Sequence, residues 1–149
     1  MDDMRDVLLG LFTEAAILEH LMRSRGEGSL PDGLQSGHFG LLNYFIVNHP
    51  DPDRISSIAW CFQEDEDYTR SKIMALAERG MLQMDAVQGS NSDAVVSLTE
   101  AGRQAHQASL DAMSPNIQLA VSEIPEEDLR TTFRTLRDIR LTLDNLPDR

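Results

Sequence analysis

The chain has 149 residues, of which 41% are hydrophobic and 26% are charged, and this composition predicts one globular domain. The 25 acidic residues outnumber the 13 basic ones and give a formal net charge of −12, so the overall field does not favour nucleic acid or anionic lipid. A single cysteine, Cys61, excludes an internal disulfide framework and a cysteine-cluster metal site. The first residues are acidic and the longest uncharged stretch, residues 33–50, is short and partly polar, so we expect a cytoplasmic protein without a membrane span.

The first half of the chain has the apolar spacing of helices. Residues 5–22 and 34–47 place apolar side chains three and four positions apart, which predicts two amphipathic helices. The segment from His49 to Asp53 contains two prolines and ends the second helix. A short helix is expected over residues 55–62, followed by a turn at residues 63–65.

The middle of the chain reads as a helix followed by a hairpin. The helix has Asp65 as its N-cap, runs to Arg79 and ends at Gly80. Two strands are expected at residues 81–86 and 94–98, joined by the polar loop 87–93. The inward face of the helix is predicted to be Thr69, Ile73, Leu76 and Ala77.

Two helices complete the chain. Thr99 caps a long helix that reaches Leu119 or beyond, although Pro115 is expected to kink or break it. The last helix is expected to start at Ser122 or Ile124, with Pro125 at its first position and acidic residues at the positive end of its dipole.

This order predicts a mainly α protein with a small β-hairpin wing, in one domain over residues 1–149. Residues 34–103 form a winged helix-turn-helix lobe, and residues 1–33 and 104–149 form flanking dimerisation helices. The first and last helices carry apolar stripes that a chain of this size has little to cover, so we expect a homodimer. The expected interface residues are Leu8, Leu11, Phe12, Leu129, Phe133, Leu136, Ile139 and Leu143.

Several motifs along the chain resemble those of the MarR family of bacterial regulators. Residues 37–44 (GHFGLLNY) resemble the second helix of that family, residues 55–59 resemble the opening of its helix-turn-helix, and residues 76–82 resemble the exit of its recognition helix. The strongest match is residues 95–103 (VVSLTEAGR), at the second wing strand and the helix after it, and residues 124–127 resemble the start of the last helix.

The resemblance covers nearly the whole chain and implies a homodimeric DNA-binding protein. One recognition helix per subunit would enter successive major grooves, and the wing would reach the flanking minor groove, usually through a basic residue. It also implies a response to small aromatic compounds or oxidants between the dimerisation and DNA-binding lobes. The residues Phe12, Leu41, Tyr44 and Phe45 are candidates for lining such a pocket, and the alternative is that they complete the core.

The charge of the lobe opposes DNA binding. DNA affinity comes mainly from neutralised phosphates, yet residues 51–102 hold four basic and ten acidic residues, a net charge of −6. Helix capping accounts for one or two acids at the start of the recognition helix, but four in a row exceed that need. This acidic cluster, expected to oppose the DNA backbone, consists of Glu64, Asp65, Glu66 and Asp67.

The candidate DNA contacts are few. Arg70 is the best candidate for reading a base edge, and Ser71 stands where the family usually has Arg. Tyr68 contacts DNA or, alternatively, packs against the third helix. No basic residue lies between Arg79 and Arg103, so the wing tip offers only an amide. The full set of candidates is Arg54, Tyr68, Arg70, Ser71, Lys72 and Asn91.

Other kinds of site find little support in the sequence. The four histidines fall in different elements without metal-ligand spacing, so no metal site or other cofactor is expected. Cys61 is interpreted as a small buried hydrophobe rather than a redox sensor. No catalytic or phosphate-binding pattern is recognisable, so we expect no enzymatic activity.

Two hypotheses of different classes remain open. The first is a dimeric MarR-like transcriptional regulator that binds DNA weakly or at a specific site. The second is a MarR-like dimer that has lost DNA binding and acts through protein–protein interaction, with its acidic lobe facing a basic partner or mimicking DNA. The acidic charge of the recognition helix and wing favours the second hypothesis. The first is favoured because most members of the family bind DNA.

Overall fold

A computed structural model describes residues 3–26, 28–48 and 51–147. The chain divides into two compact units, one up to Met113 and one from Ser114 onward. The first unit opens with helix α1 (Met4–Gly26), which confirms the first predicted helix. A short 3₁₀ helix η1 (Pro31–Gly33), helix α2 (Ser36–Asn43) and the π-helical turn η2 (Tyr44–Asn48) follow. The predicted end of the second helix at His49 and Pro50 lies outside the described residues.

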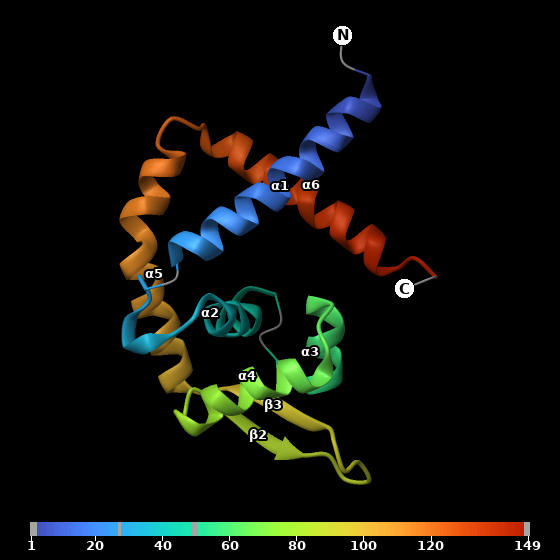
Figure 1. Ribbon diagram of the computed structural model, residues 1–149, viewed down its shortest axis with the longest axis vertical. Helices are drawn as coiled ribbons and strands as arrows, with labels where there is room; N and C mark the ends of the chain where they lie inside the picture. Colours follow the sequence, from blue (N-terminus) through green and yellow to red (C-terminus); the bar gives the residue numbers. More distant parts are fainter. Residues whose placement is uncertain (1–2, 27, 49–50, 148–149) are drawn as a thin grey trace. The chain divides into compact units, whose positions relative to one another are not determined.

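The helix-turn-helix is formed by α3 (Ile55–Phe62) and α4 (Glu66–Glu78), as the sequence predicts (Figure 1). Between them Gln63 adopts a left-handed conformation with φ of 54°. The Asp65 carboxylate accepts hydrogen bonds from the backbone N–H groups of Asp67 (2.9 Å) and Tyr68 (3.3 Å), so the predicted N-cap is confirmed. Gly80, with φ of 73°, follows the end of α4.

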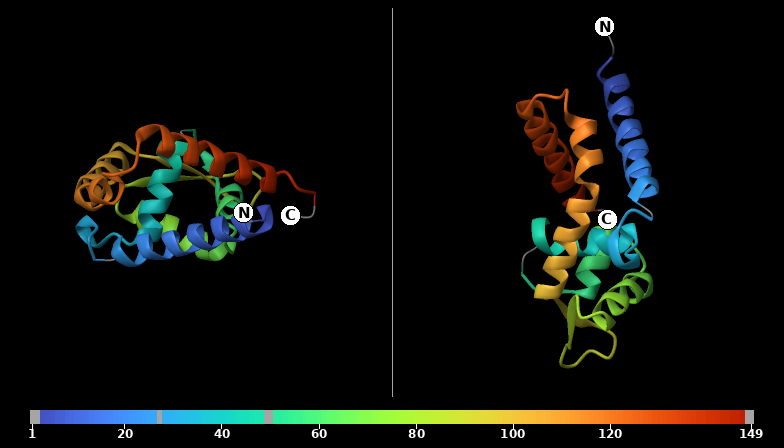
Figure 2. Two further views of the ribbon diagram at one scale, coloured as in Figure 1. Left: turned by 90° about the horizontal axis from the view of Figure 1, so that it is seen from above. Right: turned by 90° about the vertical axis from the view of Figure 1, so that its left-hand side faces the viewer.

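The wing is a three-stranded antiparallel sheet in the order β1-β3-β2. Strands β2 (Leu82–Ala86) and β3 (Ala94–Leu98) confirm the predicted hairpin, with Met84 opposite Val96. The loop between them forms the end of the hairpin (Figure 2), and its Ser92 carbonyl accepts a hydrogen bond from Arg70 of α4. Strand β1 (Asp53–Arg54) was not predicted, because two residues next to a proline show no alternating pattern.

Helix α5 (Glu100–Val121) starts in the first unit and enters the second. The Thr99 hydroxyl oxygen accepts a hydrogen bond from the Gly102 N–H (3.1 Å) and donates one to the Gly80 carbonyl (2.6 Å), which confirms Thr99 as the cap. Pro115 was expected to kink or break this helix, and it does not break it, because the helix continues through it. Proline lacks a backbone N–H and so removes one hydrogen bond from the helix, and the remaining backbone hydrogen bonds keep this turn helical.

The second unit ends with α6 (Glu126–Asp144). Pro125 is its N-cap residue rather than its first helical residue, a correction of one position. The acidic residues Glu126, Glu127 and Asp128 fill the first turn, as predicted, where they face the positive end of the helix dipole.

The hydrophobic core of the first unit joins the helices of the lobe to its sheet. Apolar side chains from α2, η2, α3, α4, β2 and β3 are buried together, so these two strands pack against the helix-turn-helix. Its most fully buried side chains are Leu41, Leu42, Phe45, Ile55, Ile58, Ile73, Leu76 and Val96.

Candidate nucleic-acid interface

Helix α4 turns one face to the core and the opposite face to solvent. Thr69, Ile73 and Leu76 are buried, at the three- and four-residue spacing that puts them on one side of a helix. The outward face therefore includes Tyr68, which is 57% exposed, together with Ser71. This is the face that a recognition helix presents to a groove.

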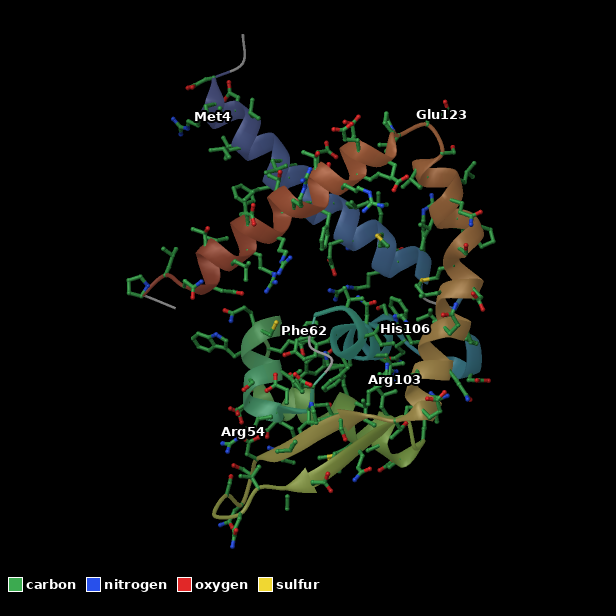
Figure 3. All side chains as sticks on the ribbon, turned by 180° about the vertical axis from the view of Figure 1, so that it is seen from behind. Met4, Arg54, Phe62, Arg103, His106 and Glu123 are labelled. Carbon is green, nitrogen blue, oxygen red and sulfur yellow. The ribbon has the colours of Figure 1, made fainter. Side chains whose placement is uncertain are left out.

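The four basic side chains of residues 51–102 each have a partner within the protein. The Arg54 guanidinium lies 4.0 Å from the Asp93 carboxylate, and the Arg70 guanidinium donates a hydrogen bond to the Ser92 carbonyl in the wing. Figure 3 shows Arg54 beside the wing. Arg79 donates to the carbonyl of Asp32 at 2.7 Å. The guanidinium groups are thus tied to backbone or carboxylate oxygens that compete with phosphate for the same N–H donors.

Lys72 is the most strongly engaged of these cations. Its Nζ lies 2.6 Å from one Glu64 carboxylate oxygen and 2.7 Å from the other, and its side chain is only 12% exposed. The same Nζ lies 4.7 Å from the centre of the Tyr68 ring and 5.7 Å from that of Phe62. An ammonium group held by a carboxylate and two aromatic rings gains little further stabilisation from contact with a phosphate.

The acidic cluster separates into two kinds of residue. Glu64 is half-buried, neutralises Lys72 and accepts a hydrogen bond from the Thr69 hydroxyl at 2.9 Å. Asp65 caps α4. Glu66 and Asp67 are exposed in the first turn. Two of the four acids therefore stabilise the fold, and the other two give the start of α4 its negative surface.

The wing is held to the start of α3 by Asp93. Its carboxylate accepts hydrogen bonds from the Ser56 hydroxyl (2.8 Å), the Ser56 N–H (3.4 Å) and the Ala94 N–H (2.9 Å). Burial raises the pKa of Asp93, but these hydrogen bonds and the charge of Arg54 outweigh it, so its pKa is lowered overall. Asn91 is exposed near the tip of the wing.

Two histidines, one in the lobe and one on α5, have structural roles. His106 on α5 (Figure 3) is buried. Its Nε2 lies 3.0 Å from the Asn43 side-chain oxygen, and its ring is stacked on that of Phe39, with 5.2 Å between the ring centres. Burial lowers the pKa of His106. His38 accepts a hydrogen bond from the Gln35 N–H at 3.2 Å, and burial lowers its pKa, with the charges of Arg79 and Lys72 adding to the effect.

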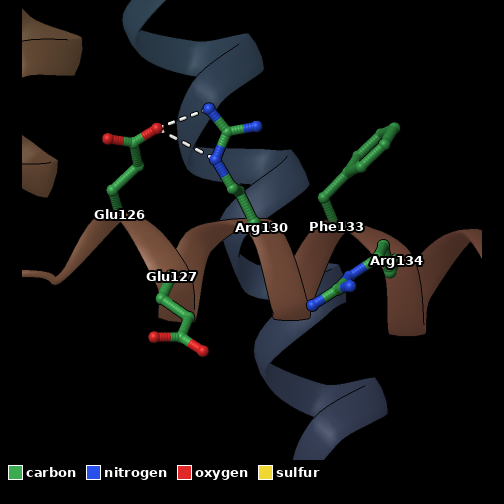
Figure 4. A pocket seen from close by; sticks show the side chains of 5 residues that line it. All are labelled: Glu126, Glu127, Arg130, Phe133 and Arg134. Carbon is green, nitrogen blue, oxygen red and sulfur yellow. Dashed lines mark hydrogen bonds and ion pairs between the residues drawn. The ribbon is translucent and has the colours of Figure 1, made fainter.

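The candidates for an aromatic pocket are divided between core and surface. Leu41, Tyr44 and Phe45 are buried in the core, as in the alternative interpretation, and the Tyr44 hydroxyl donates to the Asp53 carboxylate at 2.7 Å. Phe12 on α1 is 51% exposed. Hollows occur elsewhere: one of about 590 Å³ lies along α6 beside Phe133 and the Arg130–Glu126 ion pair (Figure 4).

Cys61 corrects another prediction, because its side chain is exposed rather than buried. The inward face of α3 is formed by Ile55, Ile58 and Ala59, and Cys61 lies off that face. Within residues 3–26, 28–48 and 51–147, no group of three or more His, Cys, Asp and Glu side chains is arranged to hold a metal ion. The helices of the same residues include none that is both long and apolar enough to cross a membrane.

The helices expected to form a dimer expose apolar side chains. On α1 the exposed residues include Leu8 and Phe12, and Leu11 is half-buried. On α6, Phe133, Leu136 and Leu143 are exposed, and the half-buried residues are Leu129 and Ile139. Exposed apolar side chains on these two helices are what a protein interface would cover.

Comparison with known proteins identifies the fold. The solved structures that resemble the chain include a MarR-family transcriptional regulator from Rhodococcus sp. RHA1, with 16% identity over 94% of this chain and 98% of that one and a TM-score of 0.72. A complex of S. aureus MepR with DNA matches with 17% identity, over 88% and 96% of the two chains, and a TM-score of 0.65. CouR from Rhodococcus jostii RHA1, bound to p-coumaroyl-CoA, matches with 15% identity, over 87% and 91%, and a TM-score of 0.70.

No protein-family model matches the sequence, and no curated protein matches it either. At these identities the likeness is one of fold. The chain has the winged helix-turn-helix fold of the MarR-family transcriptional regulators, mainly helical with a small antiparallel sheet, as the sequence motifs predict.

Proposed function

We propose that the protein is a cytoplasmic, homodimeric transcriptional regulator of the MarR type. The observation that carries this proposal is the likeness to a regulator of that fold over 94% of the chain, and we propose α4 as the recognition helix. In this proposal residues 34–103 are the DNA-binding lobe, residues 1–33 and 104–149 hold the dimer together, and no residue has a catalytic role.

The proposed contact with DNA is weak and confined to few residues. Arg70, Tyr68 and Ser71 lie on or beside the outward face of α4, and Arg54 and Asn91 flank it, so these are the side chains proposed to reach DNA. Lys72 contributes least, because Glu64 holds its ammonium group. With so few phosphates neutralised, counterion release is small. We expect no binding to random duplex at physiological salt and at best micromolar binding to a specific site.

A charge-reversal experiment tests this proposal. The variant Glu66→Lys, Asp67→Lys and Asn91→Arg converts the exposed start of α4 and the wing tip from acidic or neutral to basic. The control Glu127→Lys, Asp128→Lys and Asn116→Arg makes the same change of net charge on α5 and α6. Fluorescence anisotropy with labelled random duplex, at two salt concentrations, is expected to show binding by the first variant only, weakening as salt rises.

Three results would contradict the proposal. Nanomolar, salt-sensitive binding by the unmodified protein would mean that the acidic cluster does not face the groove. Equal binding by the two variants would mean that net charge alone attracts the duplex. Failure of the first variant to bind would mean that the two recognition helices of a dimer are not spaced like those of the MarR regulators.

A second candidate function is a dimer that does not bind DNA and acts on other proteins. The contacts that Arg54, Arg70, Lys72 and Arg79 make within the protein support this candidate. The charge-reversal experiment separates the two functions when the unmodified protein is also titrated with duplexes selected from a randomised library. Selection of one sequence favours the regulator, and failure to enrich any sequence favours the second candidate.

For the first candidate function, the transcriptional regulator, we propose a small aromatic effector. CouR, a protein of the same fold, was solved with p-coumaroyl-CoA bound, and the exposed Phe12 of this chain is an aromatic surface of the kind such ligands contact. Thermal unfolding with a panel of aromatic acids is expected to show a rise of the melting temperature with at least one member, reduced by Phe12→Ala. No rise with any member would contradict an aromatic effector.

A further inference from the structure

A hollow on the outer side of the helix-turn-helix has features that neither DNA nor an aromatic effector explains. It has a volume of about 340 Å³ and lies where α3 ends and α4 begins. We call it the α3–α4 hollow. Its lining residues are Ser56, Ala59, Trp60, Gln63, Glu64 and Glu66.

The α3–α4 hollow combines an aromatic side chain with negative charge. Trp60 is 52% exposed although it is among the largest apolar side chains of the chain. Glu66 carries an exposed carboxylate, whereas the charge of Glu64 is already balanced by Lys72. Indole is the aromatic group that attracts cations most strongly, and a carboxylate beside it strengthens the site for a guanidinium or ammonium group.

The lobe already contains a cation bound in this way. Lys72 lies between the Glu64 carboxylate, at 2.6 Å, and the faces of Tyr68 and Phe62. This internal cage is built from the same types of side chain as the α3–α4 hollow, and Glu64 belongs to both. The turn thus holds the Lys72 ammonium group between a carboxylate and two aromatic rings, and the α3–α4 hollow presents one aromatic ring and one further carboxylate to solvent.

We propose that the α3–α4 hollow is the docking site for an arginine-rich segment of another protein. One guanidinium group of the segment lies over Trp60 and against Glu66, and its aliphatic stem covers the apolar surface near Ala59. The net charge of −6 over residues 51–102 attracts the other cations of the segment. This inference does not depend on the proposed binding of DNA.

Charge complementarity favours a polypeptide over the other occupants. Phosphates of a nucleic acid would be repelled by Glu66 and Asp67. A single small cation would meet one uncompensated carboxylate at an open surface and bind weakly. A segment with several cations engages the α3–α4 hollow and the acidic surface around it at once, and so gains from multiple contacts.

The position of Trp60 allows a direct experiment, because it is the only tryptophan of the chain. The full-length protein is titrated with a synthetic peptide of alternating Arg and Ser, and separately with the same peptide carrying Glu in place of Arg. The Arg peptide is expected to give a saturable change in tryptophan fluorescence that weakens as salt rises. The Glu peptide is expected to give none.

Matched variants locate the site. Anisotropy of the labelled Arg peptide is measured with Glu66→Gln, Trp60→Leu and the control Glu78→Gln, which removes the same charge from the other end of α4. We expect about tenfold weaker binding for Glu66→Gln and about fivefold for Trp60→Leu, and less than about twofold for Glu78→Gln. Asp65 still caps α4 in all three variants, and thermal melts check that each is folded.

Three outcomes would overturn the proposal. The first is no saturable response to the Arg peptide. The second is equal weakening by Glu66→Gln and Glu78→Gln, which would mean diffuse attraction without a site. The third is saturable binding of random duplex DNA to the unmodified protein, competing with the peptide, which would assign this face to nucleic acid. Selection of a specific duplex with peptide binding intact would leave the proposed regulator and this inference both standing.

Discussion

Asp93 joins the wing to the helix-turn-helix through one carboxylate. Replacing it with Ala leaves the Ser56 N–H and hydroxyl without their partner, and the half-buried position gives water limited access. We expect Asp93→Ala to lower the free energy of unfolding by about 1–3 kcal/mol. Chemical denaturation monitored by circular dichroism measures it, with Asp85→Ala, an exposed acid on β2, as the control. Equal losses for both variants would contradict the role of Asp93.

The same residue makes stability depend on pH. Its pKa is lowered in the folded protein, so its contribution is fully present above the ordinary value of 3.8 and is lost as pH falls below that value through the folded pKa. The pKa of His106 is also lowered. Its contribution to stability is therefore fully present above pH 6.5, its ordinary pKa, and is lost as pH falls below that value. Denaturation midpoints are expected to fall in two stages between neutral and acidic pH, and Asp93→Asn is expected to remove the lower stage.

Gly102 shows how a sequence motif depends on packing. A Cβ atom at this position would lie 2.1 Å from the Met81 carbonyl oxygen and 2.6 Å from the Leu98 side chain. The first turn of α5 therefore lies directly on the start of the hairpin, and a larger residue would have to displace backbone. The motif VVSLTEAGR contains this glycine, but the sequence does not show why glycine is required there. The requirement comes from the close approach of two segments about twenty residues apart in the sequence.

Among the elements, those with a clear local signal were predicted closely. The limits of α3 and β3 match the expected residues, and α4 starts after its predicted cap. β1 has only two residues, and its pairing with β3 gives no periodic pattern along the chain. The π-helical turn over Tyr44–Asn48 was predicted as ordinary helix, because the apolar spacing there does not distinguish the two.

Helix α5 retains a proline in its interior, at a cost to stability. Pro115 donates no hydrogen bond and restricts the turn before it. Replacing it with Ala restores the donor, although the more flexible unfolded chain offsets part of the gain. We expect Pro115→Ala to raise the free energy of unfolding by about 1–2 kcal/mol.

Thermal melts of Pro115→Ala and of the control Ser114→Ala measure this effect. Ser114 is the preceding residue in the same helix, and its substitution changes helix propensity without changing the hydrogen-bond ladder. A melting temperature for Pro115→Ala that is no higher than that of the control would mean that the helix needs its proline, for example to bend.

At the scale of the whole molecule, the net charge follows from the sequence, but the distribution of unpaired charge over the surface does not. The sequence gives −6 for residues 51–102, yet Glu64 and Lys72 cancel one another and Asp65 caps a helix. Such pairs depend on side-chain conformations and on neighbours brought together by folding. The α3–α4 hollow could not be predicted from the sequence. A tryptophan is expected to be buried, and the exposure of Trp60 follows only from knowing which face of α3 points inward.

The proposed dimer gives the prediction with the largest effect. Leu136 is exposed on α6, and an unpaired carboxylate buried there in an interface would cost several kcal/mol. We expect Leu136→Asp to convert a dimer into a monomer, measured by light scattering at micromolar concentration. The control Thr131→Asp, which adds the same charge on another side of α6, is expected to remain dimeric. A monomer before any substitution would contradict the proposed interface.

The bond between Asp93 and the first turn of α3 also has a consequence for hydrogen exchange. The amide hydrogen of Ser56 is held by a side chain that precedes β3, not by a carbonyl of its own helix. When the hairpin separates from β1, that amide loses its protection, so its hydrogen exchange reports on the wing rather than on α3. A partner that orders the wing would therefore slow exchange at the start of a helix it never touches.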